Sequence, residues 1–328
     1  MSKTSKLIYF FIFLVTILGI VPWLIEISGR WDYYYTLTSV ALLSIASSGV
    51  WLTFYIGRIN IGQGAYALAG GYVVAILVTK YDVSFWLSVP IAGLFCSFVS
   101  MLIGASILRL RGVYFAMITL VLTEVAKLTA MSLPITNGAK GISSIALPGE
   151  LSIFGISIIP DFSTLANVKL AFYYVAVILM IFVFAGMYRL VNSRIGHLCR
   201  SLQQNEELAS SIGVNITILR IIAYSISSFL GGIGGAIFIS ISQSVYPTTF
   251  QVADSINFML NVFVGGMGYV FGPMIGTLFI YFGWDLLFTT GKYQLLIYSS
   301  IIIALILVLP NGLLSLRIFN KSNKRETK

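Results

Sequence analysis

Residues 36–79 read TLTSVALLSIASSGVWLTFYI, GRIN and IGQGAYALAGGYVVAILVT in succession. The outer two pieces are apolar runs of about 20 residues, the length at which a helix rising about 1.5 Å per residue crosses a hydrocarbon core of about 30 Å. A helix satisfies its own backbone hydrogen bonds where water is absent, and the alternating polarity of a membrane β-barrel is missing here. Residues 36–79 therefore predict two membrane-spanning helices separated by a short polar break.

The rest of the chain repeats this pattern. Of 328 residues, 58% are hydrophobic and only 9% are charged, a balance outside the range of soluble domains. The chain is thus predicted to be an all-α, polytopic integral membrane protein that forms one transmembrane domain over residues 1–328. We expect about ten spans, with boundaries uncertain by a few residues, near 7–27, 36–56, 61–79, 85–108, 113–132, 170–189, 218–241, 254–270, 273–290 and 293–309.

The first run is interpreted as an anchor and not as a cleaved signal peptide, because it is too long and has no small-residue cleavage site before Trp31. Most of the 20 lysines and arginines fall in predicted loops on one side of the membrane, which the positive-inside rule assigns to the cytoplasm. Both termini, including a basic tail at 311–328, are then cytoplasmic. The net charge of +9 follows from this topology, and its scatter over many loops argues against nucleic-acid binding.

Residues that often carry redox or metal chemistry are few. Cys96 lies in a predicted span and Cys199 in a cytoplasmic loop, so an internal disulfide is not expected. His197 belongs to no constellation of Cys, His or carboxylate residues at metal-ligand spacing, and we predict no metal site. No phosphate-binding Gly-x4-Gly-Lys-Ser/Thr motif occurs, so any ATP that powers this protein must bind to another chain.

The polar break at 57–64 is too polar and too rich in glycine for a lipid-facing helix start, and it indicates a broken or re-entrant segment buried in protein. Thr119 with Thr123, and Asn257 with Asn261, recur at helical spacing and form candidate pore faces. Interhelical hydrogen bonding is the alternative interpretation of each pair. Small-residue spacing at Gly231, Gly235, Gly268, Gly272 and Gly276 predicts close contacts between helices.

Two long loops interrupt the short connections. The outer loop, 133–168, is rich in Gly, Ser, Ile and Pro and suits an ordered external cap or docking surface, although it could simply join two helices. The inner loop, 190–219, has the pattern of short amphipathic helices, with Asn205 and Asn215 as caps and Gly213 as a terminator. Such a helix fits a partner's groove, and the alternative is a helix that lies on lipid headgroups.

Charge within the predicted spans is sparse. Carriers driven by protons or sodium generally bury carboxylates along their pathway, yet only Glu124 lies well inside a span, and Lys127 follows on the same helical face and could neutralise it. The sequence therefore favours transport powered by partner ATPases.

The sequence resembles a known family through three stretches: LRLRGVYFA at 108–116, VGGMGYVFGP at 264–273 and PNGL at 310–313. These stretches, together with 57–66, 136–142 and the cytoplasmic segment from 193, are similar to motifs of the M-type permease subunits of bacterial ABC importers for branched-chain amino acids. The motif residues carried over are Arg109, Arg111, Gly112, Tyr114, Phe115, Gly265, Gly266 and Gly268. The sequence departs from the family at Asn60, where serine is usual, at Gln63, where histidine is common, and at His197 and Cys199, so the solute could also be urea, an amide or another small solute.

The resemblance implies a multi-pass subunit in the bacterial cytoplasmic membrane that moves branched-chain amino acids or a related small polar solute. Its implied partners are a second homologous permease subunit, two ABC ATPase subunits, an extracytoplasmic solute-binding protein and membrane lipid. The chain itself would be no enzyme and hold no cofactor, with ATP and Mg²⁺ on the ATPases. Expected ATPase-coupling residues are Arg194, Gly196, Glu206, Glu207, Ala209 and Gly213. Expected translocation-path residues are Asn60, Gly62, Gln63, Thr119, Thr123, Glu124, Asn257 and Asn261.

Rival hypotheses belong to other classes of protein. A self-sufficient secondary carrier or channel would transport in liposomes without partners. A noncatalytic scaffold would transport nothing with any partner, yet it would have little use for polar faces on several spans. A membrane enzyme is disfavoured, because no nucleophile, base or metal cluster stands out in the sequence.

Overall fold

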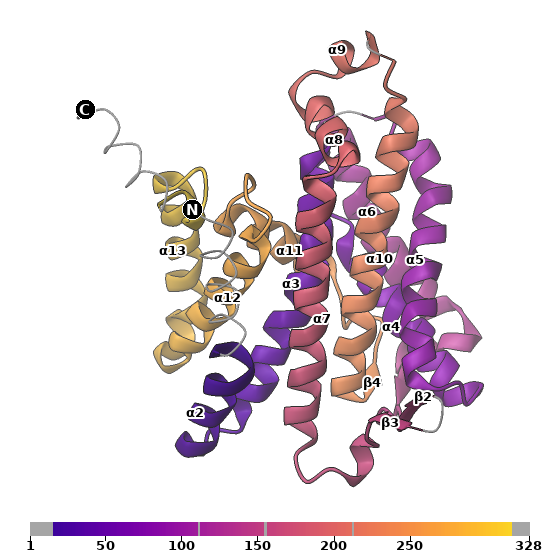
Figure 1. The fold of residues 1–328 in the computed structure, drawn as a ribbon, viewed down its shortest axis with the longest axis vertical. Coiled ribbons are helices and arrows are strands. Elements are labelled where there is room, and N and C mark those ends of the chain that lie inside the picture. Colours follow the sequence, from indigo (N-terminus) through magenta and orange to yellow (C-terminus); the bar gives the residue numbers. More distant parts are fainter. Residues whose placement is uncertain (1–15, 111, 154–155, 212, 317–328) are drawn as a thin grey trace.

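The computed structural model describes residues 16–110, 112–153, 156–211 and 213–316, and shows long helices lying side by side in a bundle (Figure 1). The helices are α2 (Val21–Ser28), α3 (Asp32–Tyr55), α4 (Gln63–Lys80), α5 (Phe85–Ile107), α6 (Val113–Ser132), α7 (Val168–Val191), α8 (Arg194–Gln204), α9 (Glu206–Ser211), α10 (Ile216–Ser242), α11 (Val252–Gly265), α12 (Gly272–Leu286) and α13 (Gln294–Val308). Short 3₁₀ segments lie at Pro134–Thr136, Gly138–Lys140, Phe162–Thr164, Phe288–Tyr293 and Leu313–Ser315, and a π-helical turn, Thr16–Ile20, leads into α2.

The all-α, polytopic fold is confirmed. By length and composition, six helices of the described chain could cross a membrane: Asp32–Tyr55, Phe85–Ile107, Val113–Ser132, Val168–Val191, Ile216–Ser242 and Gly291–Val308. Helices α4, α11 and α12 coincide with three further predicted spans but are shorter or less apolar. Residues 7–15 of the predicted span at 7–27 lie outside the described residues. A total of about ten spans therefore stays a prediction.

Helix α10 is the centre of the bundle and packs against α3, α4 and α5. Glycine permits this close approach: a Cβ on Gly235 would overlap the carbonyl oxygen of Ala67 in α4, and one on Gly70 would overlap the backbone of Gly232. The predicted role of Gly231 and Gly235 is confirmed. The same prediction is wrong for Gly268, which lies with open space around it in the turn between α11 and α12.

The chain between α3 and α4 turns back into the bundle. Gln63, the first residue of α4, donates from Nε2 to the carbonyl oxygens of Ala46 and Ser227, at 3.0 and 2.9 Å. Ala46 lies well before the end of α3, about 13 Å back along the helix axis at 1.5 Å per residue. Segment 56–62, which we call the re-entrant segment, therefore runs from the end of α3 to mid-bundle, and the predicted broken segment is confirmed.

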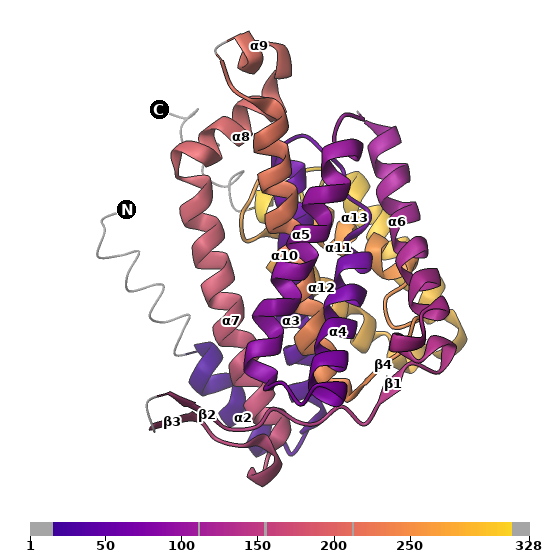
Figure 2. The same ribbon diagram turned by 90° about the vertical axis from the view of Figure 1, so that its right-hand side faces the viewer.

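The two ends of the bundle differ. Helices α8 and α9 form one end, and short strands lie at the opposite end (Figures 1 and 2). There β1 (Ile142–Ser143) pairs antiparallel with β4 (Ser244–Val245), and β2 (Leu151–Ile153) pairs with β3 (Ile156–Ile159). The Trp86 indole also donates to the Gly149 carbonyl at 2.8 Å. The described part of loop 133–168 is thus ordered, while its external location stays a prediction.

Replacing Gly235 with Leu should lower the melting temperature of the purified chain in detergent, because the new side chain forces α10 away from α4 at a cost of roughly 1–3 kcal/mol or more. Gly186→Leu on α7 is the matched control, since no atom lies within 4 Å of a Cβ built there. Equal melting temperatures for the two variants would contradict this account of the α4–α10 contact.

Replacing Gln63 with Leu keeps the size of the side chain and removes its hydrogen bonds. We expect a loss of about 1–3 kcal/mol for each buried group left without a partner, read out as a lower melting temperature. Gln204→Leu, at the exposed end of α8, provides the control. A Gln63 variant as stable as the Gln204 variant would show that the amide does not hold the re-entrant segment.

Candidate functional site

The amide of Gln63 is hydrogen-bonded on both sides at the middle of the bundle. Besides its two bonds to backbone carbonyls, its Oε1 accepts from Ser227 Oγ at 3.2 Å and from Asn60 Nδ2 at 3.3 Å. Asn60 Oδ1 in turn accepts from the Gly62 N–H at 2.9 Å. The Asn60, Gln63 and Ser227 side chains are buried. The re-entrant segment is thereby tied to both α3 and α10.

Helices α6 and α11 complete this polar centre. Thr119 Oγ1 accepts from the Ile61 N–H at 3.1 Å, and Ser255 Oγ accepts from the Gly64 N–H at 2.9 Å. Thr123 and Ser255 share a hydrogen bond of 3.0 Å. Five of the residues predicted for the translocation path are therefore brought together: Asn60, Gly62, Gln63, Thr119 and Thr123. Because they bond to one another and to the backbone, they form one polar centre in the middle of the bundle.

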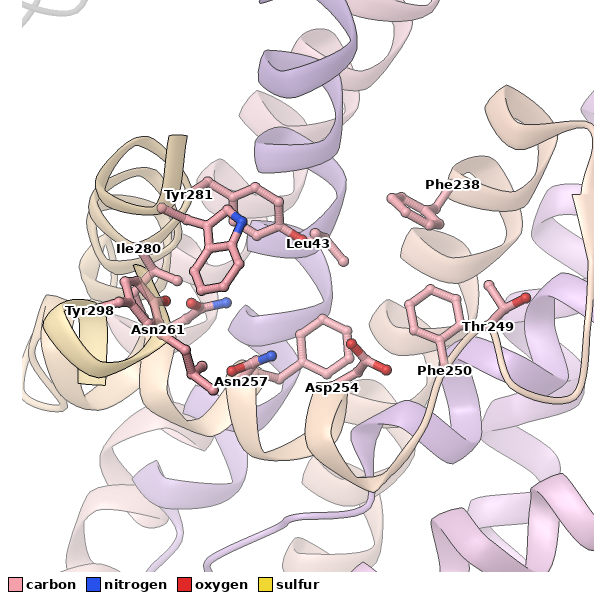
Figure 3. Close-up of a pocket in the computed structure, with 13 residues that line it drawn as sticks. Leu43, Phe238, Thr249, Phe250, Asp254, Asn257, Asn261, Ile280, Tyr281 and Tyr298 are labelled. Atoms are coloured by element: carbon pink, nitrogen blue, oxygen red, sulfur yellow. The ribbon is translucent and has the colours of Figure 1, made fainter. Parts of the chain in front are cut away.

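Asn257 and Asn261, which were also predicted for the translocation path, line a cavity of about 420 Å³ (Figure 3). Asp254, Asn257 and Asn261 form its polar wall on one face of α11. Asn261 Nδ2 donates to Ser47 Oγ at 2.9 Å, whereas its buried Oδ1 has no hydrogen-bond partner among the described residues. The apolar and aromatic walls come from Leu43, Phe238, Phe250, Phe258, Ile280, Tyr281, Trp284, Leu295 and Tyr298. The cavity can therefore hold a small solute with polar groups on one side and apolar groups on the other.

Asp254 was missed as a candidate site residue, although its spacing from Asn257 and Asn261 places all three on one helical face. Its Oδ2 also accepts from the Gln251 N–H at 2.8 Å, so the carboxylate caps the start of α11 and also faces the cavity.

Glu124, another residue predicted for the translocation path, lies elsewhere. It pairs with Lys127 at 2.6 Å on a partly exposed face of α6, as the spacing predicted, and it lines neither the polar centre nor this cavity.

The predicted coupling segment forms the two helices α8 and α9. Gly196 packs where a Cβ would overlap the backbone oxygens of Leu190 and Val191, while Arg194 is exposed. Burial raises the pKa of the Cys199 thiol to about 11, so this cysteine is neutral at physiological pH and inert as a nucleophile.

The caps predicted for this segment are confirmed. Asn205 Oδ1 accepts from the Leu208 N–H at 3.0 Å, and Asn215 Oδ1 accepts from the Ile218 N–H at 3.1 Å. Ala209 is buried, Glu207 is exposed, and Gly213 has a φ of +84°, a conformation that favours glycine. The local sequence thus determines where each of these short helices begins and ends.

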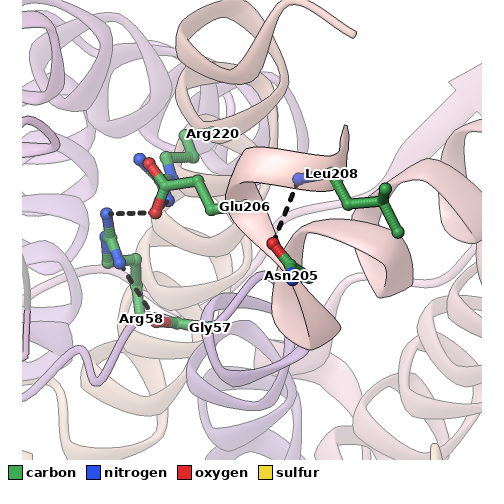
Figure 4. Close-up of polar contacts among 6 residues, drawn as sticks. All are labelled: Gly57, Arg58, Asn205, Glu206, Leu208 and Arg220. Carbon is green, nitrogen blue, oxygen red and sulfur yellow. Dashed lines mark hydrogen bonds and ion pairs between the residues drawn. The ribbon is translucent and has the colours of Figure 1, made fainter. Parts of the chain in front are cut away.

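Glu206 connects this segment to the bundle (Figure 4). Its Oε2 lies 2.7 Å from Arg220 Nη2 and 3.7 Å from Arg58 Nη2. The side chains of Arg58 and Arg220 are only 6% and 7% exposed. Sequence reasoning predicted a role for Glu206 but missed both arginines, because these residues lie far apart in the chain and share no helical face.

Among the motif residues at 108–116, Phe115 and Gly112 have structural roles. Phe115 is buried and meets the Tyr224 ring edge-on at 6.0 Å, and Gly112 has a φ of +56°, while Arg109 and Tyr114 are exposed. Arg111 lies outside the described residues.

The glycine motif at 264–273 meets the one at 310–313. A Cβ on Gly312 would overlap Gly266, whose own φ is +119°, and a Cβ on Gly265 would overlap the Gly272 carbonyl. Trp51 Nε1 donates to the Met267 carbonyl at 2.8 Å and ties this turn to α3. The two motifs form one packing unit.

A family model described as branched-chain amino acid transport system / permease component matches residues 33–310. The high-affinity branched-chain amino acid transport system permease protein LivM of Salmonella typhimurium is 28% identical over 274 residues, which cover 79% of this chain and 64% of that protein. The probable branched-chain amino acid transport permease protein LivH of Methanocaldococcus jannaschii is 25% identical over 83% of this chain and 88% of its own length.

A more distant likeness reaches the ribose import permease protein RbsC of Escherichia coli, which is 30% identical over 38% of this chain and 41% of that protein. No solved structure matches the chain. The chain thus spans 64% of the length of the LivM relatives, and the family model covers most of it from α3 to the end of α13. The protein belongs to the family of branched-chain amino acid transport system permease components.

Proposed function

We propose that this chain is the permease subunit of an ATP-driven ABC importer in a bacterial cytoplasmic membrane. It works with a second homologous permease subunit, two ABC ATPase subunits and an extracytoplasmic solute-binding protein. The ATPases bind ATP and Mg²⁺, so the chain needs no cofactor and catalyses no reaction of its own. The α8–α9 end and both termini face the cytoplasm, and the end with the short strands faces outward.

The observation that carries this proposal is the position of α8 at the end of the bundle and of α9 projecting beyond it (Figure 1). These short polar helices expose apolar side chains, with Ile195 47% and Leu208 65% exposed. Exposed apolar side chains on a protruding helix suit insertion into a partner's groove.

The solute proposed is a branched-chain amino acid or a related small polar solute. The names of the LivM and LivH relatives support this choice, and so does the cavity beside α11. Its polar wall, which includes Asp254, can bind an ammonium or amide group, and its apolar walls can take up an aliphatic side chain. The apolar walls are less suited to a sugar, whose hydroxyl groups all require hydrogen-bond partners.

A pull-down of the tagged chain from its native membrane in mild detergent tests the proposal. We expect mass spectrometry to identify two Walker-motif ATPases and a second permease, because α8 and α9 offer a docking surface for them. Proteoliposomes with the whole complex and the binding protein should take up labelled leucine only when ATP is present.

The same assay on the chain alone is the control and should show no uptake. Uptake by the chain alone without ATP would establish a self-sufficient carrier and overturn the proposal. A chain that purifies only with copies of itself would also contradict it.

A further inference from the structure

Two buried arginines share one carboxylate where the coupling segment meets the bundle. Arg58 belongs to the re-entrant segment, Arg220 to the first turns of α10, and Glu206 opens α9 and is 23% exposed (Figure 4). A carboxylate held between two desolvated guanidinium groups is costly to remove, because both cations then face each other in a medium of low dielectric constant. Glu206 therefore holds these three elements together.

One route leads from Glu206 to Gln63 through the re-entrant segment. The backbone N–H of Arg58 donates to the Thr53 carbonyl at 2.9 Å, so Arg58 marks the point where the chain leaves α3. The end of α8 packs against the neighbouring Gly57, since a Cβ built on Gly57 would lie 3.5 Å from Gln203 Cα. From Arg58 the chain reaches Asn60, whose side chain bonds to Gln63.

A second route leads through α10. Arg220 and Ser227 lie on the same helix, about two turns or 10 Å apart along its axis. A packed helix moves as a rigid unit over this distance, and Ser227 contacts Gln63 through both its carbonyl oxygen and its hydroxyl. Both routes from Glu206 thus end at the same buried amide, that of Gln63. Together the two routes form a closed ring of contacts.

We propose that Glu206 is a positioning residue that sets the depth of the re-entrant segment in response to the ATPase-facing helices. A movement of α8 and α9 is transmitted through Arg58 and Arg220 together, so Gln63 and the polar centre around it shift with the coupling segment. This inference rests on the proposed function, since it takes the ATPases to be what moves α8 and α9.

The first experiment uses the assembled importer with Glu206→Gln. The amide retains the shape of the side chain but lacks the charge that both arginines require. We expect the ATPases still to co-purify and to hydrolyse ATP, while leucine taken up per ATP falls about tenfold, a usual size for the coupling between two sites.

The matched control is Asp32→Asn, which breaks the exposed ion pair with Lys169, 3.4 Å long, at the opposite end of the bundle. This variant should leave the ratio of uptake to hydrolysis unchanged. Unchanged coupling in Glu206→Gln, with the wild type coupled, would overturn the inference and leave the proposed function standing. Absence of ATP-dependent uptake in the wild type would instead overturn the proposed function.

Charge exchange separates positioning from general stability. Glu206→Arg combined with Arg220→Glu keeps two arginines and one carboxylate in the cluster. The double variant should recover part of the coupling that each single variant loses, and losses that simply add would contradict the ion-pair linkage.

A second readout does not depend on transport. Hydrogen exchange of the Ile61 and Gly62 amides, which bond to Thr119 and Asn60, should be about tenfold faster in the Glu206→Gln complex than in the wild type. Unchanged exchange at these amides would show that Glu206 does not hold the re-entrant segment.

Discussion

The backbone of 56–62 enters the helical bundle without being helical, and where it is buried its polar groups need partners within the protein. Gln63 anchors the end of this segment. Its amide joins the end of the re-entrant segment to the backbones of α3 and α10, and Thr119 and Ser255 bind the neighbouring N–H groups. These bonds fix how deep in the bundle α4 begins. They also fix the positions of α6 and α11 relative to the start of α4.

Close packing makes this arrangement possible. Side-chain amides can reach a neighbouring backbone only where helix axes approach closely, and Gly231 and Gly235 on α10 give α4 that approach. The same principle operates at the turn between α11 and α12, where Gly265, Gly266 and Gly312 lie against one another. The bundle therefore combines small residues, which set the spacing of the helices, with a few amides and hydroxyls, which set their register. The cavity beside α11 is lined instead by aromatic residues, among them Phe238, Phe250 and Tyr281.

Much of this architecture could be predicted from the sequence, because length, apolarity and capping residues act locally. The bounds of α5 and α6, the caps at Asn205 and Asn215, the Glu124–Lys127 pair and the break at 57–64 all follow from neighbouring residues. Contacts between distant segments could not be predicted. Nothing in the sequence pairs Arg58 with Glu206 and Arg220, or brings Asp254 into a cavity with aromatic residues of α12 and α13, because such contacts depend on how helices pack and not on their own periodicity.

We propose that ATPase subunits act on the membrane bundle at the α8–α9 end of this chain. The most direct measurement places a photo-activated cross-linking amino acid at Leu208, which is largely exposed on α9, and identifies the adduct formed in the native membrane. The account predicts a covalent adduct with a Walker-motif ATPase, formed in high yield at this position and lost when the reporter is moved to the exposed Tyr81 at the opposite end. An adduct only with lipid, or only with a second copy of this chain, would contradict the account.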